Sequence, residues 1–246
     1  MKDRCEALAR LLRQSNRVVF FGGAGFSTES GIKDYRSKDG LYNTVKEYGV
    51  PPETILSRSF FLKKPEIFYD FYYKYFLSET PAPNPAHYAL AQLEQMGKLT
   101  AVITQNIDGL HQAAGSRTVL ELHGTIATYH CIRCRKPYPV EEVTSLHGGV
   151  PRCPHCGGLI HPDVVLYEEG LDGDTVEAAV EALVEADLLI IGGTSLAVYP
   201  AASFLRYFGG DHIVLINRDE TPYDGRAELI FRESIGQVLK ATMKLV

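Results

Sequence analysis

Four cysteines near the middle of the chain have the spacing of a metal site. Two Cys-x-x-Cys pairs, separated by 18 residues, are formed by Cys131, Cys134, Cys153 and Cys156. Four thiolates complete a tetrahedron around zinc and leave no position for a reacting water, so we expect a structural zinc and not a catalytic one. A redox-active dithiol pair or free thiols are the alternative. His130 and His155, beside the cysteines, are expected to be surface residues.

A glycine-rich loop follows the first expected strand. The apolar run 17–21 leads into Gly23 and Gly25. The missing side chains would let a pyrophosphate approach backbone N–H groups and the N-terminus of a following helix, although a generic glycine turn is the alternative. The G-x-G-x-x-G fingerprint fails, because Thr28 takes the third glycine position and no strand ending in an acidic residue follows to hold a ribose. A hydride-transferring dehydrogenase is therefore disfavoured.

Polar residues follow several other expected strands. Residues 105–108 follow one strand, His123 follows the next, and residues 193–195 and Asn217 follow two more. In an open parallel sheet, ligands bind beyond the carboxyl ends of the strands, so we expect these residues to meet in one crevice.

The elements that must position these residues alternate between strand and helix. Apolar runs predict strands at 17–21, 100–104, 119–122, 164–167, 188–191 and 213–216. Helices are expected near 87–95, 175–186 and 201–208, and a last helix is expected to begin with a capping box at 234–237. This alternation predicts an α/β fold, a Rossmann-like parallel sheet with helices on both faces.

Two segments interrupt the alternation and are expected to form a smaller lobe. Segment 41–83 is dense in Tyr and Phe, which favours a small helical core over an aromatic ligand box, and the cysteine segment is expected to be a zinc-ribbon module with four cysteine ligands. The expected large, Rossmann-like domain comprises 1–40, 84–126 and 159–246, and the expected small domain comprises 41–83 and 127–158.

Composition excludes several classes of function. The net charge of −5 and the pI near 5.9 offer no broad basic face, so nucleic acid is not expected as a ligand. No apolar stretch approaches the roughly 18 residues of a membrane span, and we see no signal peptide. Paired Cys-x-x-Cys motifs suit a reducing compartment. A cytoplasmic protein is expected.

The motifs together resemble those of the sirtuins, in the same order along the chain. They are GAGFS at 23–27, GIKDYR at 31–36, TQNIDGLH at 104–111, ELHG at 121–124, the four cysteines and GTSLAVYPAA at 193–202. The sequence resembles a bacterial zinc-containing sirtuin over nearly its whole length. The resemblance implies an NAD-dependent protein-lysine deacetylase, an enzyme that transfers the acetyl group of acetyl-lysine to ADP-ribose and releases nicotinamide. NAD is then a co-substrate, and an acetylated protein or peptide is the expected partner.

The resemblance also assigns the site. The implied catalytic residues are His123, as the general base that deprotonates a ribose hydroxyl, and Asn106. The implied cofactor-binding residues are Gly23, Ala24, Gly25, Thr28, Asp34, Tyr35, Arg36, Gln105, Asn106, Ile107, Asp108, His123, Gly193, Thr194, Ser195 and Asn217. Asp108 is expected to accept a hydrogen bond from the nicotinamide carboxamide.

An extended peptide is expected to pair with backbone on both sides of the cleft. The implied substrate residues are Val165, Leu166, Glu168, Glu169 and Val198, and Phe26 is a further candidate for the wall of an acyl-lysine tunnel. Lys33, Tyr35 and Glu168 depart from the residues usual in the family. The family's acidic-acyl enzymes carry a Tyr-x-x-Arg pair, and the nearest match here, 72–75, lacks the arginine, which favours acetyl over succinyl groups.

Three other functions stay open at this point. An NAD-dependent ADP-ribosyltransferase or NAD hydrolase would keep the same cofactor residues. A deacylase that prefers other acyl groups would keep the same mechanism. A non-enzymatic module that binds zinc and senses NAD is disfavoured by the acidic charge and by His123.

Overall fold

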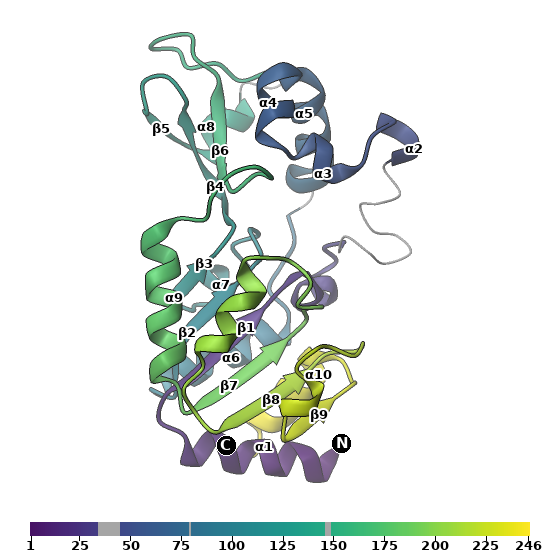
Figure 1. The fold of residues 1–246 in the computed structure, drawn as a ribbon, viewed down its shortest axis with the longest axis vertical. Coiled ribbons are helices and arrows are strands. Elements are labelled where there is room, and N and C mark those ends of the chain that lie inside the picture. Colours follow the sequence, from purple (N-terminus) through teal and green to yellow (C-terminus); the bar gives the residue numbers. More distant parts are fainter. Residues whose placement is uncertain (34–44, 79, 146–148) are drawn as a thin grey trace.

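A six-stranded parallel sheet forms the larger part of the molecule (Figure 1). The computed structural model describes residues 1–33, 45–78, 80–145 and 149–246. The strand order is β3-β2-β1-β7-β8-β9. The strands are β1 (Val18–Gly22), β2 (Leu99–Thr104), β3 (Val119–Glu121), β7 (Leu188–Gly192), β8 (His212–Ile216) and β9 (Leu229–Phe231). The central strands are apolar and buried, as expected for a sheet that is covered on both faces.

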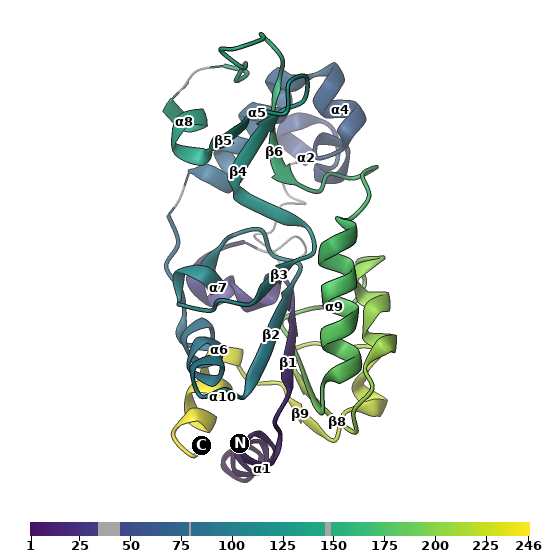
Figure 2. The same cartoon turned by 90° about the vertical axis from the view of Figure 1, so that its left-hand side faces the viewer.

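Helices cover the two faces of this sheet (Figure 2). Helices α1 (Lys2–Gln14), α6 (Pro85–Gln95) and α10 (Ile235–Met243) pack on one face, where Leu8, Leu90 and Leu239 are fully buried. Helix α9 (Gly173–Glu185) and the 3-10 helix Ala201–Tyr207 cover the other face. The predicted Rossmann-like architecture is confirmed.

The second unit combines short helices with a three-stranded antiparallel sheet, in the order β5-β4-β6. Its strands are β4 (Gly124–Cys131), β5 (Pro137–Pro139) and β6 (Ile160–Val164). Its helices are α2 (Val45–Tyr48), α3 (Pro52–Ile55), α4 (Arg58–Lys63), α5 (Pro65–Tyr72) with a π-helical turn Tyr73–Leu77, and α8 (Val140–Ser145). Phe61, Phe68 and Tyr69 are buried here, so the aromatic segment is a core, as predicted.

One expectation about the strands is wrong, and one strand was not anticipated. The apolar run 164–167 is not a strand of the parallel sheet. The strand lies earlier, at β6, and pairs antiparallel with β4 in the small sheet. Strand β9 was not expected, because three residues are too short for a periodic signal. The limits of the two domains stay a prediction, and the pairing of β6 with β4 favours placing Ile160–Val164 in the smaller one.

The expected capping box of the last helix is not formed. The side chain of Ser234 makes no capping hydrogen bond in α10. Instead, Gly236 N donates to Glu29 Oε1 at 3.0 Å, so a residue 207 positions away satisfies this orphan N–H group. A carboxylate at a helix N-terminus also interacts favourably with the helix dipole.

No described helix is long and apolar enough to cross a membrane.

Two buried histidines pack beneath the glycine loop. The rings of His87 and His111 lie 4.8 Å apart between centroids, and both contact Phe26. Burial lowers the pKa of His87 to about 4 and that of His111 to about 3. His87 Nδ1 accepts a hydrogen bond from Asn84 N at 3.1 Å, so this nitrogen carries no proton and the ring is neutral. Both histidines therefore have a structural role.

We expect this pair to make the fold sensitive to acid. The unfolded chain takes up protons below pH 6.5 while the folded histidines stay neutral, so stability is present above pH 6.5 and is lost as the pH falls towards 4. Each histidine lowers the free energy of unfolding by about 2 kcal/mol between pH 6.5 and 5. Urea unfolding at several pH values measures this. In His111→Phe, about one proton fewer should be taken up on unfolding, so the free energy of unfolding should depend less on pH. His155→Gln, at an exposed position, should leave this dependence unchanged. Equal pH slopes for all three proteins would contradict the assignment.

Candidate functional site

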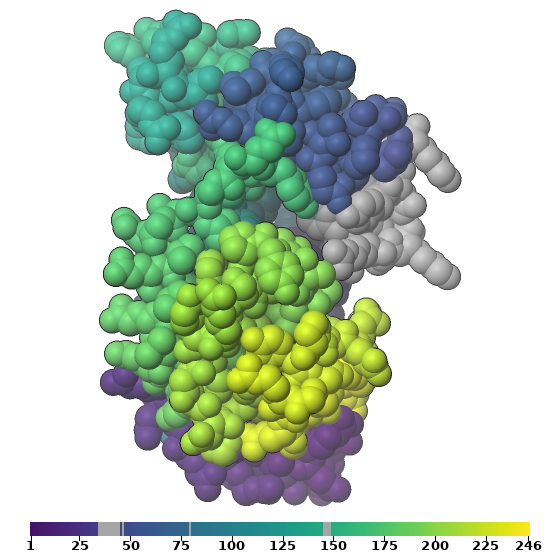
Figure 3. Space-filling view, viewed as in Figure 1, coloured from purple at the N-terminus to yellow at the C-terminus, as the bar shows by residue number. Residues whose placement is uncertain are grey.

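A cleft of about 1310 Å³ lies between the two units, at the carboxyl ends of the parallel strands. Figure 3 shows the small unit above the large one, bridged on this face by the segment that follows β6. The cleft is lined by most of the residues expected from sequence: Ala24, Gly25, Thr28, Gln105, Asn106, Ile107, Asp108, His123, Gly193, Thr194, Ser195, Asn217, Val165, Leu166, Glu168, Glu169 and Val198. Strand ends far apart in sequence therefore meet in one crevice.

Asp34, Tyr35 and Arg36 lie outside the described residues. Two other candidates do not line the cleft. Gly23 packs behind it, where an added Cβ would lie 3.1 Å from Thr194 Cβ. Phe26 is fully buried against Phe20 in the core of the large unit, so its expected place in an acyl tunnel is wrong.

The glycine loop is locked against the loop that follows β7. Gly25 N donates to Gly193 O at 2.8 Å, and a Cβ on Gly25 would lie 2.9 Å from that oxygen. Gly193 has φ +60°, and a Cβ there would lie 2.3 Å from Phe26 N. Glycine is thus required at both positions because two backbones touch.

Among the described residues that follow the glycine loop, up to position 33, there is no long helix, contrary to expectation. Two 3-10 turns, Ala24–Phe26 and Thr28–Ser30, stand in its place, and Thr28 Oγ1 donates to Gly25 O at 3.0 Å. A helix dipole is therefore not available to bind phosphate here. Anion binding at this loop would depend on individual backbone N–H groups.

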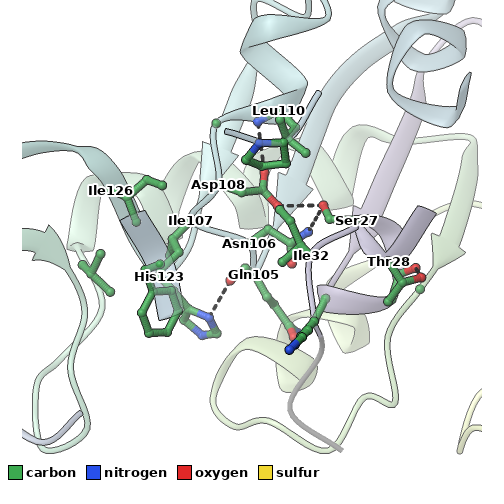
Figure 4. Close-up of a pocket in the computed structure, with 18 of the residues that line it drawn as sticks. Ser27, Thr28, Ile32, Gln105, Asn106, Ile107, Asp108, Leu110, His123 and Ile126 are labelled. Atoms are coloured by element: carbon green, nitrogen blue, oxygen red, sulfur yellow. Dashed lines mark hydrogen bonds between the residues drawn. The ribbon is translucent and has the colours of Figure 1, made fainter. Parts of the chain in front are cut away.

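A serine that the sequence assignment did not include joins two of the expected residues (Figure 4). Ser27 is buried, donates through Oγ to Asp108 Oδ2 at 2.7 Å, and accepts from Asn106 Nδ2 at 3.0 Å. Leu110 N donates to Asp108 Oδ1 at 3.0 Å. Burial raises the pKa of Asp108, while these hydrogen bonds oppose the shift. Ser27 lies within the GAGFS motif, which was the available signal.

His123 has the geometry of a proton acceptor. Its Nδ1 lies 3.0 Å from Gln105 O (Figure 4). A carbonyl oxygen can only accept, so Nδ1 carries the proton and Nε2 keeps a lone pair. Burial lowers the pKa of His123, and the bond to Gln105 opposes this shift. The ring is therefore neutral near pH 7.

The segment that follows β6 is fastened to the small unit. Tyr167 N donates to Leu56 O and Arg58 N donates to Tyr167 O, both at 3.0 Å. The Glu169 carboxylate accepts from Leu166 N at 2.8 Å and from Arg58 Nη1 at 2.9 Å. One edge of the segment is thus paired, and the Glu169 side chain is held inside the protein.

Glu168 has a backbone conformation that favours glycine. Its φ is +76°, and its carboxylate accepts from Ser59 N and Ser59 Oγ, both at 2.9 Å. The side chain therefore binds the start of helix α4.

The four thiols form one cluster in the small unit. All four Sγ atoms lie within 4.8 Å of one another. The Cys131–Cys156 and Cys134–Cys153 Sγ pairs are 3.4 Å and 3.6 Å apart, far longer than a disulfide bond and close to the spacing of thiolates around tetrahedral zinc. The cluster fits a structural zinc ion.

The histidines beside the cluster are not part of it. His130 Nδ1 hydrogen-bonds to Asp163 instead, and His155 is exposed, so the expectation for His155 is confirmed while His130 is only partly exposed. Tyr138 Oη lies 3.0 Å from Cys153 Sγ and is placed to donate to the thiolate.

Comparison with known proteins identifies the family. The sequence profile of the Sir2 family matches residues 23–200. The chain belongs to the Sir2 family. It is 49% identical over 241 residues to an NAD-dependent protein deacetylase of Clostridium acetobutylicum, covering 98% of each chain, and 50% identical to that of Clostridium perfringens, covering 97% of this chain and 98% of the relative.

Solved Sir2 structures share the fold over the whole chain. One Sir2 enzyme structure superposes with a TM-score of 0.89 at 38% identity and covers all of both chains. Another, a Sir2 variant with a deacetylated p53 peptide and 3'-O-acetyl ADP-ribose, gives a TM-score of 0.89 at 39% identity, with 99% of this chain and 98% of the other covered. The resemblance to sirtuins seen in the sequence is confirmed.

We expect Ser27→Ala to destabilise the Sir2 site locally. The variant removes one donor from a buried carboxylate, which raises the pKa of Asp108 further and costs about 1.5–3 kcal/mol of unfolding free energy at pH 7. Urea unfolding and a carboxyl-carbon NMR titration measure the two effects. Ser116→Ala is the matched control, because Ser116 is buried and its hydroxyl has no hydrogen-bond partner among the described residues. Equal behaviour of the two variants would contradict this role.

We expect the purified protein to contain about one zinc ion per chain. Cys153→Ser should lose the metal and lower the thermal stability of the small unit, since one of the four thiolates of the tetrahedral shell is removed. Cys5→Ala should keep its zinc, because Cys5 lies in helix α1, in the core of the large unit. Elemental analysis checks this, and full zinc content in Cys153→Ser would rule out the four-thiolate site.

Proposed function

We propose that this protein is an NAD-dependent protein-lysine deacetylase of the sirtuin type. It transfers the acetyl group of acetyl-lysine to ADP-ribose, and nicotinamide is released. The observation that carries the proposal is the position of His123, whose unprotonated Nε2 shares one cleft with the interlocked glycine loops and the buried Asn106–Ser27–Asp108 network. Relatives that are about half identical over their whole length are NAD-dependent protein deacetylases.

The residues of this chain would hold NAD along the strand ends. Bound NAD supplies an activated glycosidic bond and the ribose that receives the acetyl group. Gln105, Asn106, Ile107 and Asp108 would surround the nicotinamide and its ribose. Ala24 would offer a backbone N–H group, whereas the N–H groups of Gly25 and Gly193 already donate to Gly193 O and Ile216 O. Thr194, Ser195 and Asn217 would contact the adenosine end. Asp34, Tyr35 and Arg36 complete the proposed set.

His123 would act as the general base. Its bond to Gln105 O orients the ring and fixes the tautomer, so that Nε2 can take a proton from a ribose hydroxyl. Asp108 would accept from the carboxamide, and Ser27 would hold Asp108 and Asn106 in place. Holding reactants in one orientation lowers the entropic part of the barrier.

The peptide would lie between the segment 165–169 and the segment around Val198. One edge of the first segment is paired with the small unit. An added strand would pair with the other edge, where Leu166 N and O are now bonded to Glu169. Lys74 lies within the segment 72–75 that lacks the arginine of the acidic-acyl enzymes, and it is paired with Glu47. A neutral acetyl group is therefore favoured over a succinyl group.

The cluster of four cysteines would keep the small unit in shape and take no part in the reaction, since none of the four lines the cleft. We also propose a cytoplasmic location, because none of the five cysteines forms a disulfide and paired Cys-x-x-Cys motifs suit a reducing compartment. ADP-ribosyl transfer or NAD hydrolysis would use the same NAD contacts and is the alternative activity.

One experiment tests the proposal. The protein is incubated with NAD and an acetyl-lysine peptide, and nicotinamide, peptide mass and NADH absorbance are followed. We expect nicotinamide release that depends on the peptide, with loss of the acetyl group. Nicotinamide release without peptide would favour NAD hydrolysis, gain of ADP-ribose by the peptide would favour ADP-ribosyl transfer, and NADH formation would overturn the family of reactions proposed here.

We expect His123→Ala to lower kcat/KM for deacetylation by about 10²–10⁴-fold, with the fold and zinc content unchanged. The wild-type rate should fall with acidification only below the usual histidine value of 6.5, since burial lowers the pKa of His123 and the base must be neutral. A pH profile of kcat/KM measures this. His212→Ala, at a position remote from the cleft, serves as the control. Retained turnover in His123→Ala would refute the assignment.

A further inference from the structure

A single arginine organises the loop at the adenosine end of the cleft. The loop begins after β8 with Asn217, Arg218 and Asp219, all of which line the cleft. Arg232 follows β9, the edge strand beside β8, and does not line the cleft itself. Its side chain lies behind the loop and reaches it through three separate contacts.

The contacts of Arg232 converge on the backbone of this loop. Its Nη1 donates to Asn217 O at 3.0 Å and to Asp219 O at 2.8 Å. Its Nη2 forms an ion pair with Asp224 Oδ2. The other carboxylate oxygen of Asp224 accepts from Thr221 N and Thr221 Oγ1, both at 2.9 Å. Arg232 and Asp224 together therefore hold both ends of segment 217–224.

Only an arginine can make this set of contacts. The guanidinium group presents several N–H donors in a rigid plane, so it can bind two carbonyls and a carboxylate at once. A lysine ammonium in its place would have to choose among partners that lie on different sides. The Asn217 side chain adds to the same arrangement, since its Nδ2 donates to Asp219 O at 2.9 Å.

We propose that Arg232 is a positioning residue for the adenosine half of NAD. It acts through Asn217 and the neighbouring backbone by holding the cleft wall in its binding conformation before NAD arrives. Preorganisation of this kind improves affinity because the loop loses less conformational freedom on binding. This inference rests on the proposed function, since it assumes that the adenosine end of NAD lies against residues 217–219.

Arg232→Lys and Arg232→Met test the inference. We expect the KM for NAD and the Kd for ADP-ribose to rise about tenfold in Arg232→Met, which corresponds to the loss of one or two hydrogen bonds. The rise should be smaller in Arg232→Lys. The kcat value and the KM for peptide should stay within about twofold of wild type, because His123 and the peptide segment are held by other contacts.

Arg226→Met is the matched control. Arg226 lies in the same region and stacks on Tyr223, but it does not bind the backbone of the cleft wall. An unchanged KM for NAD in Arg232→Met would overturn the inference. So would a general defect in both Arg232 variants, in which kcat falls, both KM values rise by an equal factor and Tm is lowered. Calorimetry measures the Kd for ADP-ribose directly, so this readout does not depend on turnover. Wild-type protein that binds ADP-ribose without deacetylating would count against the proposed function alone, and an unchanged Kd in both Arg232 variants would count against Arg232 alone.

Discussion

The contact between the loops that follow β1 and β7 is the constraint on which the rest of the site depends. Gly25 and Gly193 meet backbone to backbone, and neither position has room for a Cβ atom. This contact closes the bottom of the cleft and sets where the chain turns after β1. Ser27 follows two residues later, and its position in turn fixes Asp108 and Asn106. The buried Asn106 and the half-buried Asp108, which would face nicotinamide, are thus placed by the packing of two loops that neither residue belongs to.

Much of the fold and of the site could be predicted, because the signals were local. The four cysteines carry their own spacing, and the polar residues after apolar strands indicate an edge where strands end together. What could not be predicted depends on contacts between distant segments. Ser27 carries no spacing signal of its own and owes its role to Asp108, 81 positions away. Glu29 caps a helix that begins 206 positions later, and no local pattern could indicate that partner.

The misplaced strand has a similar origin. The run 164–167 is apolar, which fits a buried strand equally well in either sheet. Strand β6 precedes this run and pairs with β4. The cysteine cluster includes Cys131, at the end of β4, and so holds β4 close to the segment that leads into β6. The remaining apolar residues then leave the sheet and form a wall of the cleft. The cysteine cluster thus lies at the start of β6, where Cys131 pairs with Ile160, and the cleft wall begins after the other end of the strand, Val164.

Glu168 shows how such a wall can change while the reaction is kept. A left-handed backbone costs a non-glycine residue about 1–2 kcal/mol. Two hydrogen bonds from Ser59 to a carboxylate each contribute a comparable amount, so they offset the cost. Glycine at this position would avoid the strain but would leave the segment attached through main-chain contacts and the Glu169–Arg58 ion pair alone. With glutamate, the wall is tied by a side chain to helix α4, and a negative charge is added beside the edge where a peptide would pair. We infer that the catalytic residues tolerate this change because His123 and Asp108 are held from the large unit and do not depend on it.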